Sequence, residues 1–316
     1  DALQAKGIHR VSLKWHYRSQ HEDLIAFSNH KFYDGRLITF PTPTHDRQPG
    51  LGVRLEYVPD GRYMATRVRQ EKGGIQRNLR ANIIEASRVA ELVMRHAHER
   101  PQESLGVVAF NINQRDAIEE ALVHARSLDR SVEAFFQEDR SEPFFVKSLE
   151  FVQGDERDVI IISVGFAKNE DDKLSHNFGP INQKMGPRRL NVLVTRARRE
   201  VIVVSSIKAE DISLDRTQAE GAKQLKAYLD FAENGPLALE REASGGDGDY
   251  ESPFEEAVGT ALEQEGYTVH RQVGCSGYRI DLAIVHPHRP GRYILGLECD
   301  GKTYHQSKTA RDRDRL

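Results

Sequence analysis

Arginine gathers in two segments of the sequence that could hold a negatively charged group. Trp15-His16-Tyr17-Arg18-Ser19 follows an alternating apolar stretch, and RRLNVLVTRAR (188–198) precedes an apolar run. Guanidinium groups are planar and always charged, so they suit the oxygens of a phosphate. A phosphate that is being hydrolysed spreads negative charge over its oxygens and needs fixed cations around it. Together the segments predict a phosphate-facing site, although each alone is typical of a solvated basic surface.

A third segment, VQGDERD (152–158), lies between these two and contains a turn-forming glycine among acidic residues. It immediately precedes the β-branched run VIIISV (159–164), just as RRLNVLVTRAR shortly precedes VIVV (201–204). Runs of this composition are typical of buried strands in a parallel sheet. All three segments are therefore expected to lie at strand ends.

The first two-thirds of the chain alternates strand and helix signals. Apolar alternation and β-branched runs predict strands over 11–15, 53–57, 105–110, 159–164 and 201–204. Helical spacing predicts helices over 22–33, 83–93, 113–125 and 217–231. This order is typical of an α/β fold with a parallel sheet and helices on both faces. Ligands of such sheets bind at the carboxyl ends of strands, where we also expect the three segments.

In this order and spacing, HYRS, VQGDERDVIIIS and RRLNVLVTRAR resemble motifs IV, V and VI of superfamily 1 helicases. The branch that they resemble contains the nonsense-mediated-decay helicase, and the likeness covers about residues 11–232. It implies that residues 1–235 form the second RecA-like domain of an ATP-dependent motor. It also implies that Arg18 and Arg196 reach across a cleft to the γ-phosphate. For Arg188, Arg198 and Arg199 the ordinary interpretation of a charge run, a solvated basic face, stands.

The same resemblance gives roles to positions around these arginines. Some would face the nucleotide or couple it to nucleic acid, and others would contact the nucleic acid itself. The first set is Gln153, Gly154, Glu156 and Thr195, and the second set is Ser148 and Asn111. The turn Met185-Gly186-Pro187 departs from the family pattern, which leaves the loop before motif VI undefined.

A motor of this kind also needs a phosphate-cradling loop and a magnesium carboxylate. Nothing upstream of Arg18 supplies them, and the sequence does not begin with Met. We therefore expect a fragment whose partner, the first RecA-like domain of the same protein, lies in further N-terminal sequence. ATP and Mg²⁺ are the expected cofactors, and the fragment alone is expected to be inactive as an ATPase.

The segment GLECDGKT (296–303) formally matches a phosphate-binding loop. Such a loop works by pointing backbone N–H groups at an anion, and Glu298 and Asp300 inside it would repel that anion. We therefore reject this interpretation in favour of a metal site. A small-molecule kinase that uses this loop remains a further alternative, which a phosphate ordered at Lys302 would support.

Two carboxylates of the C-terminal segment are placed to share a metal ion. Strands are predicted over 268–273, 279–285 and 293–298, with Asp281 in the second and Glu298 at the end of the third. Neighbouring strands could bring both carboxylates to one Mg²⁺ that activates water for phosphodiester cleavage. Ordinary polarity at a sheet edge is the alternative.

The run YRIDLAIVHP…YILGLECDGKTYH resembles the PD-(D/E)xK nucleases, and among them the very-short-patch-repair-endonuclease-like domains. The resemblance implies that Asp281 and Glu298 are the metal ligands. The usual lysine is Asp300 here, so His305 is the expected catalytic base and Lys302 a weaker candidate. We expect a linker over 236–249 and, over 250–316, the N-terminal part of a smaller, truncated α/β restriction-endonuclease-like domain whose first helix starts at SPFE (252–255).

Composition excludes two classes of protein. Net charge is −3 with 29% charged residues, so the chain is not a globally basic nucleic-acid binder, although a local basic stripe is compatible with it. No apolar run approaches the roughly 20 residues that a membrane helix needs. The two cysteines, Cys275 and Cys299, make no C-x-x-C pair and suit a reducing, cytoplasmic compartment.

These observations predict the C-terminal part of a superfamily 1 helicase or translocase with a fused nuclease-like domain. DNA is the expected partner, with RNA as an alternative, in DNA processing, repair or defence. The alternative function is a non-catalytic nucleic-acid-binding remodeller whose nuclease fold is degenerate. An intact phosphate loop elsewhere in the protein would favour the motor.

Overall fold

The computed structural model describes residues 14–39, 50–68, 77–236, 238–239, 252–273, 280–287 and 293–299. The chain divides into two compact units, each described here by itself. The larger comprises Tyr17–Asp34 and Pro49–Ala243, and the smaller comprises Asp1–His16, Gly35–Gln48 and Ser244–Leu316. No helix in the described ranges is both long enough and apolar enough to cross a membrane.

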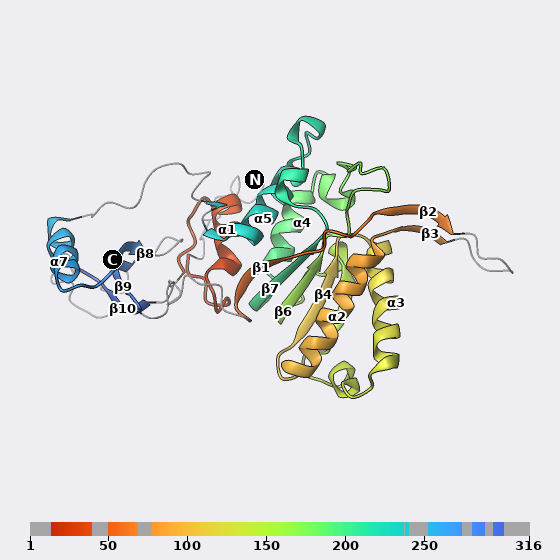
Figure 1. The fold of residues 1–316 in the computed structure, drawn as a ribbon, viewed down its shortest axis with the longest axis horizontal. Coiled ribbons are helices and arrows are strands. Elements are labelled where there is room, and N and C mark those ends of the chain that lie inside the picture. Colours follow the sequence, from red (N-terminus) through yellow and green to blue (C-terminus); the bar gives the residue numbers. More distant parts are fainter. Residues whose placement is uncertain are drawn as a thin grey trace, which may run out of the picture. The chain divides into compact units, whose positions relative to one another are not determined.

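A five-stranded parallel sheet forms the centre of the larger unit (Figure 1). Its strand order is β1-β7-β6-β4-β5. Because β6 and β7 lie inside the sheet, their β-branched residues are buried on both faces, as the runs 159–164 and 201–204 predict. The strands are β1 (Gly52–Tyr57), β4 (Leu105–Ala109), β5 (Phe145–Ser148), β6 (Arg157–Ser163) and β7 (Ala197–Ser205).

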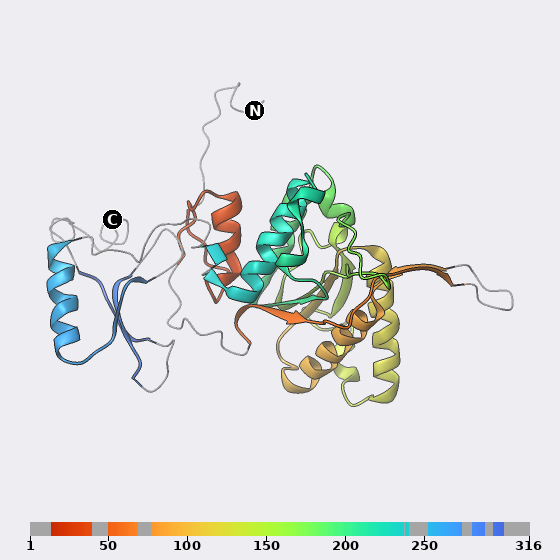
Figure 2. The same ribbon diagram turned by 45° about the horizontal axis from the view of Figure 1, so that its top comes forward.

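Helices cover both faces of this sheet (Figures 1 and 2). On one face, α2 (Ile83–Glu99) packs against α3 (Ile112–Leu128), and their apolar sides enclose a core with the sheet. On the other face lie α1 (Asp23–Phe32), α4 (Gly186–Val194) and α5 (Glu220–Asn234). Short 3-10 turns connect these elements: η2 (Glu133–Phe136), η3 (Leu149–Phe151), η4 (Gly179–Asn182), η5 (Ala209–Asp211) and η6 (Leu214–Arg216).

The predicted α/β fold is confirmed, with element ends shifted by a few residues. Three described strands of the larger unit were not predicted: the short edge strand β5 and the two strands of a hairpin between β1 and α2. The motif segment at 188–194 proves to be helical. Of the strand predicted over 11–15, residues 11–13 lie outside the described residues, and Trp15 makes only an isolated bridge to Ile38.

The hairpin consists of β2 (Met64–Val68) and β3 (Arg77–Ala81), which pair antiparallel. It forms a two-stranded sheet separate from the central one. Both ribbon views show it extending away from the sheet and helices (Figures 1 and 2). The chain leaves β1 at the carboxyl edge of the central sheet and returns through the hairpin to the start of α2.

The smaller unit contains α7 (Pro253–Gln264) and an antiparallel sheet of order β10-β9-β8. Its strands are β8 (Val269–Val273), β9 (Ile280–Val285) and β10 (Tyr293–Leu297). Ser252 caps α7 by accepting the Glu255 N–H at 3.2 Å, so the predicted helix start is confirmed. Within the segment predicted as a linker, Pro236, Ala238 and Leu239 are helical, and residues 240–249 lie outside the described residues.

Candidate functional site

The residues predicted to face a phosphate lie together at the amino ends of β6 and β7. Glu156 directly precedes β6, and Arg196 directly precedes β7. Arg18 precedes α1, and its Nε lies 3.1 Å from Glu156 Oε2. The expectation that the segments lie at the carboxyl ends is therefore wrong. Glu156 and Arg196 lie before their strands and not after them. In a parallel sheet these positions fall at the amino edge, which is opposite to the carboxyl edge that was expected.

Arg196 is held by the C-terminal turn of α4. Its Nε donates to the Val192 carbonyl at 2.7 Å, and its Nη2 donates to Thr195 Oγ1 at 3.0 Å. The Thr195 hydroxyl in turn lies 3.0 Å from the Asn191 and Val192 carbonyls. Helix C-terminal carbonyls attract cations, so the end of α4 orients this guanidinium with two groups. Thr195 thus positions Arg196 in this structure.

The electrostatic surroundings of Arg196 are unusual for an arginine. Burial lowers the pKa of Arg196, and the positive charge of Arg18 lowers it further. Within the described residues Arg196 has no ion-pair partner, whereas Arg18 pairs with Glu156. The charges of Glu156 and Asp155 oppose this shift only in part. Two neighbouring cations, one of them half-buried and in no ion pair within the described residues, form a place where a phosphate would be stabilised.

Arg198 has a different task from Arg196. Its guanidinium pairs with Asp158 at 2.9 Å, with Glu156 at 3.4 Å and with Glu142. Glu142 and Asp158 raise the pKa of Arg198 further above its ordinary value. The side chain is part-buried, so the solvated role expected from sequence is wrong for this residue. The missed signal is the acidic Asp158 of VQGDERD, which β6 places beside β7.

The turn before β6 contains the two other motif V positions. Gly154 has φ +93°, a conformation that favours glycine, and a Cβ there would meet open space. Gln153 is exposed beside it. The turn is tied to β5 because Lys147 Nζ lies 2.6 Å from Asp155 Oδ2. Gln153 and Gly154 therefore lie on an exposed turn just before Glu156, the partner of Arg18, and their coupling role stays a prediction.

The two predicted nucleic-acid contacts lie at the opposite, carboxyl edge of the sheet. Asn111 follows β4 and caps α3, where its side chain accepts the Gln114 N–H at 2.9 Å. Ser148 ends β5 and is 1% exposed, and its hydroxyl has no hydrogen-bond partner among the described residues. A contact between Ser148 and nucleic acid would require the residues that bury it to move. Both roles stay predictions.

A buried polar cluster at this carboxyl edge was missed from sequence. Glu85, at the start of α2, accepts hydrogen bonds from Ser163 Oγ and the Gly165 N–H at 2.7 Å each, and from Ser206 Oγ at 3.0 Å. Burial raises the pKa of Glu85 to about 7. The available signal was the capping pattern Asn82-x-x-Glu85 directly before an apolar run. The cluster joins the ends of β6 and β7 to α2.

In the smaller unit, Asp281 and Glu298 come from neighbouring antiparallel strands. Leu297 pairs with Leu282, so Glu298 follows in register with Asp281. Asp281 Oδ2 accepts the Cys299 N–H at 2.7 Å, which directs its carboxylate toward the end of β10. Within the described residues no group of three or more His, Cys, Asp or Glu side chains is placed to hold a metal ion. Two carboxylates with water still suit Mg²⁺, and the predicted site stays a prediction.

Other residues predicted for the smaller unit cannot be placed. Asp300, Lys302 and His305 lie outside the described residues. Glu255, at the start of α7, is buried and engaged locally: Ser252 Oγ donates to its Oε1 at 2.9 Å, and Gln272 Nε2 donates to its Oε2 at 3.4 Å. These contacts give Glu255 a structural role in the start of α7.

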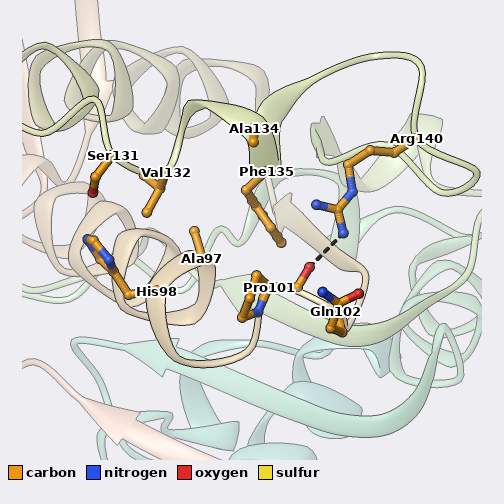
Figure 3. Close-up of a pocket in the computed structure, with 9 residues that line it drawn as sticks. All are labelled: Ala97, His98, Pro101, Gln102, Ser131, Val132, Ala134, Phe135 and Arg140. Atoms are coloured by element: carbon orange, nitrogen blue, oxygen red, sulfur yellow. Dashed lines mark hydrogen bonds between the residues drawn. The ribbon is translucent and has the colours of Figure 1, made fainter.

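A pocket of about 480 Å³ lies at the C-terminal ends of α2 and α3 (Figure 3). Arg140 lies on one side, donating to the Pro101 carbonyl at 2.7 Å, and His98 lies on the other. His98 Nε2 contacts Asp129 Oδ2 at 2.7 Å, and Ser131 Oγ donates to Asp129 Oδ1 at 2.6 Å. These hydrogen bonds lower the pKa of Asp129 to about 2. Because Ser131 donates to the carboxylate and not to the histidine, this is no activated nucleophile.

Comparisons with known proteins agree with this arrangement. A family model described as an AAA domain matches residues 1–208, and a restriction-endonuclease family, REase_MTES_1575, matches residues 254–316. Two relatives are named uncharacterized ATP-dependent helicases: MG140 of Mycoplasma genitalium and its homolog in Mycoplasma pneumoniae. Each is 33% identical, over 223 and 229 residues respectively, in matches that cover 70% of this chain. A regulator of nonsense transcripts 1 from Takifugu rubripes is 26% identical over 211 residues, or 66% of this chain.

The chain spans only 18% of the length of each of these relatives. Their names nevertheless agree with the superfamily 1 resemblance of HYRS, VQGDERD and RRLNVLVTRAR, and the endonuclease match agrees with the resemblance of the C-terminal segment. The parallel sheet with helices on both faces and the smaller antiparallel unit match the two expected folds. The chain therefore belongs to the AAA domain family, among its superfamily 1 helicase-like members. It also carries a restriction-endonuclease-like domain at its C-terminus.

Proposed function

We propose that the larger unit is the second RecA-like domain of an ATP-driven helicase or translocase. In this proposal Arg18 and Arg196 bind the γ-phosphate of an ATP whose phosphate loop and Mg²⁺ are supplied by the first RecA-like domain. Both guanidinium groups would stabilise the charge that spreads over the phosphate oxygens during hydrolysis. Glu156 would hold Arg18 until nucleotide binds, and Gln153 and Gly154 would transmit the change toward nucleic acid.

One observation carries this proposal: Arg196 is half-buried beside Arg18, and burial and that neighbouring charge both lower its pKa. A cation in such surroundings is costly unless an anion compensates it. The hydrogen bonds to Val192 and Thr195 fix its orientation before any ligand arrives. Preorganised charge of this kind is what phosphoryl transfer requires.

The test is steady-state ATPase activity of the full-length protein carrying Arg196→Ala or Arg18→Ala. Loss of a transition-state cation should lower kcat by about 10²–10⁵-fold while nucleotide still binds. Arg188→Ala, which removes an exposed arginine from α4, is the matched control and should keep kcat within about twofold of wild type, since distant surface changes are usually small. An unchanged kcat in Arg196→Ala would overturn the proposal and favour a non-catalytic remodeller.

We further propose that the smaller unit cuts or binds DNA with a divalent metal. The support is the pairing of β9 with β10, which brings Asp281 and Glu298 into register, together with the match to a restriction-endonuclease family. DNA is favoured over RNA because of that match. A reducing, cytoplasmic location suits the scarcity of cysteine.

A further inference from the structure

A basic hairpin leaves the larger unit at the carboxyl edge of the sheet, and the helicase motifs do not account for it. β2 and β3 pair from Met64↔Ala81 to Val68↔Arg77 and form their own sheet. Both views show the hairpin reaching away from the helices and the central sheet (Figures 1 and 2). A two-stranded ribbon alone is marginally stable in water, so it adds little to the fold. A projecting ribbon is more typical of a binding element.

The start of the hairpin is fixed to the body of the unit. The Tyr63 N–H donates to the Lys168 carbonyl at 3.1 Å, and the Tyr63 ring stacks on Phe166 with 5.9 Å between centroids. Just before it, a Cβ on Gly61 would lie 2.0 Å from Ser206 Oγ. Glycine is therefore required for β2 to leave so close to the end of β7.

The end of the hairpin is fixed as firmly. Asn82 follows β3, and its N–H donates to Gln114 Oε1 at 2.8 Å while its carbonyl accepts from Gln114 Nε2 at 3.1 Å. Its side chain donates to Ser206 Oγ at 2.8 Å. Both strands therefore emerge from the buried polar cluster around Glu85. Gln114 lies one helical turn from Asn111, so the hairpin ends near a predicted nucleic-acid contact.

The described part of the hairpin and its approach, residues 61–68 and 77–81, contains four arginines and neither aspartate nor glutamate. This composition contrasts with the net charge of −3 of the whole chain. Arg62 and Arg80 are exposed. The register pairs Ala65 with Arg80 and Val68 with Arg77, so both arginines of β3 lie within the paired part of the ribbon. The whole segment 62–80 contains six basic residues and one acidic residue, Glu71, and such an excess of positive charge attracts a phosphate backbone.

We propose that the β2–β3 hairpin is a separate nucleic-acid-binding element that grips the phosphate backbone of duplex DNA. This inference rests on the proposed motor function and adds a contact outside motifs IV, V and VI. A two-stranded ribbon fits the major groove of B-form DNA, which is about 12 Å wide. The deep, narrow major groove of A-form RNA does not admit it. The arginines of both strands would supply positive charge to the phosphates along the groove.

The experiment measures binding of the full-length protein to fluorescein-labelled duplex DNA by anisotropy over a range of salt concentrations. The variant is Arg67→Gln with Arg77→Gln and Arg80→Gln. A control with the same change in charge replaces three exposed arginines elsewhere in the unit, Arg95, Arg130 and Arg216, by Gln. A third variant replaces Arg67, Arg77 and Arg80 by Lys, which keeps the charge.

Each lost phosphate contact lowers the slope of log K against log salt by about 0.9. The hairpin Gln variant should therefore lose about two to three units of slope and at least about tenfold in affinity at low salt. The control should keep the wild-type slope, and the Lys variant should restore most of it. The same measurements with single-stranded DNA and duplex RNA of equal length identify the nucleic acid that the hairpin binds. A loss of affinity that is greatest for duplex DNA supports binding in its major groove. An equal loss for all three nucleic acids overturns that assignment.

Two outcomes separate the failure of this inference from the failure of the proposed function. Steep salt dependence in the wild type with an equal slope in the hairpin Gln variant overturns the hairpin assignment and leaves the motor intact. A wild-type protein that binds no nucleic acid overturns both. Thermal melting of the hairpin Gln variant within about 2 °C of wild type shows that binding, and not folding, has changed.

Discussion

At the scale of single residues, Glu85 is the group on which most of the carboxyl edge depends. Its carboxyl group receives hydrogen bonds from the ends of β6 and β7 and from the segment after β6, although it is fully buried. Burial of a carboxylate without a cation favours its neutral form, which is why its pKa rises. The protonation of one side chain therefore affects how tightly three elements are joined.

This shift predicts how stability depends on pH. The folded state holds the Glu85 proton up to a pKa of about 7, whereas an unfolded glutamic acid loses it near 4.5. As pH rises through that window the unfolded state is favoured by its deprotonation, so stability falls, and it levels off above about 7. The fall contributed by Glu85 should be up to about 3 kcal/mol. Urea unfolding at pH 5 and pH 8 measures it.

Glu85→Gln provides the comparison because its amide does not titrate. The fall in stability between pH 5 and pH 8 should be smaller in this variant than in wild type by the contribution of Glu85. Glu91→Gln, an exposed position on the same helix, should leave the fall as it is in wild type. Equal falls in wild type and Glu85→Gln would show that Glu85 is not the titrating group.

Sequence alone predicts some residues of the site and not others, for a physical reason. Arg18 and Arg196 lie in motifs whose order along the chain is diagnostic, and arginine is itself a phosphate-binding residue type. Their proximity in the structure agrees with that expectation. Glu142, Asp158 and Glu85 act through partners far along the chain, such as Arg198 or Ser206, which only the pairing of parallel strands brings near. The edge of the sheet was also predicted wrongly. Motifs V and VI precede their strands, so their residues lie at the amino edge and not at the carboxyl edge.

At the scale of elements, α4 and α5 depend on one carbonyl group. Both helices begin against the Ile181 carbonyl, where a Cβ on Gly186 would lie 1.7 Å and a Cβ on Gly221 1.9 Å from its oxygen. The turn Met185-Gly186-Pro187, which departs from the family pattern, therefore starts α4 by close backbone approach. Since the other end of α4 holds Arg196, the position of the guanidinium depends on this contact.

Two glycine substitutions test this dependence. Gly186→Ala should destabilise the protein by about 1–3 kcal/mol because the new methyl group has no space. It should also lower ATPase activity of the full-length protein through displaced Arg196. Gly154→Ala meets open space and should cost only about 1 kcal/mol, from the positive φ alone. Chemical denaturation ranks the two, and equal costs would contradict the contact at Ile181.

Elements with a long periodic pattern were predicted well, and short ones were not. Continuous apolar faces are buried in α2, α3, β6 and β7, so the spacing of their apolar residues predicts their secondary structure. β5 has four residues at a sheet edge, and the hairpin has arginines where a core strand would have valines. β5 has only one fully buried residue, which is too few to produce a pattern, and it gains its place from pairing with β4.

At the scale of the whole molecule, the proposed function gives the arginine pair only one side of a nucleotide site. The 316-residue chain by itself should therefore show no nucleic-acid-stimulated ATP hydrolysis above the background of buffer. Phosphate release with and without single-stranded DNA checks this. Mixing in a separately purified first RecA-like domain is the positive control, since binding across the cleft should restore measurable turnover. Robust turnover by the chain alone would mean that a phosphate-binding loop lies within it, and GLECDGKT would then be reconsidered.

The two units should also be separable by chemistry. In the full-length protein, Asp281→Asn and Glu298→Gln should abolish nicking of supercoiled DNA in Mg²⁺ or Mn²⁺, because each removes a charge that the metal needs. ATPase activity should persist in both. Glu256→Gln, an exposed change on α7, is the control. Persistent nicking in Asp281→Asn would assign any cleavage to other residues.

Strand β7 has a consequence for mechanical stiffness. It begins directly after Arg196, runs for nine residues, and ends beside Ser206 at the base of the hairpin. Hydrogen bonds to β1 and β6 brace it on both sides over about 30 Å. A strand that is hydrogen-bonded on both sides resists stretching and bending, so its two ends move together. In a motor of the proposed kind, a movement of Arg196 during nucleotide binding or hydrolysis would therefore be transmitted along β7 and displace the hairpin by a similar amount.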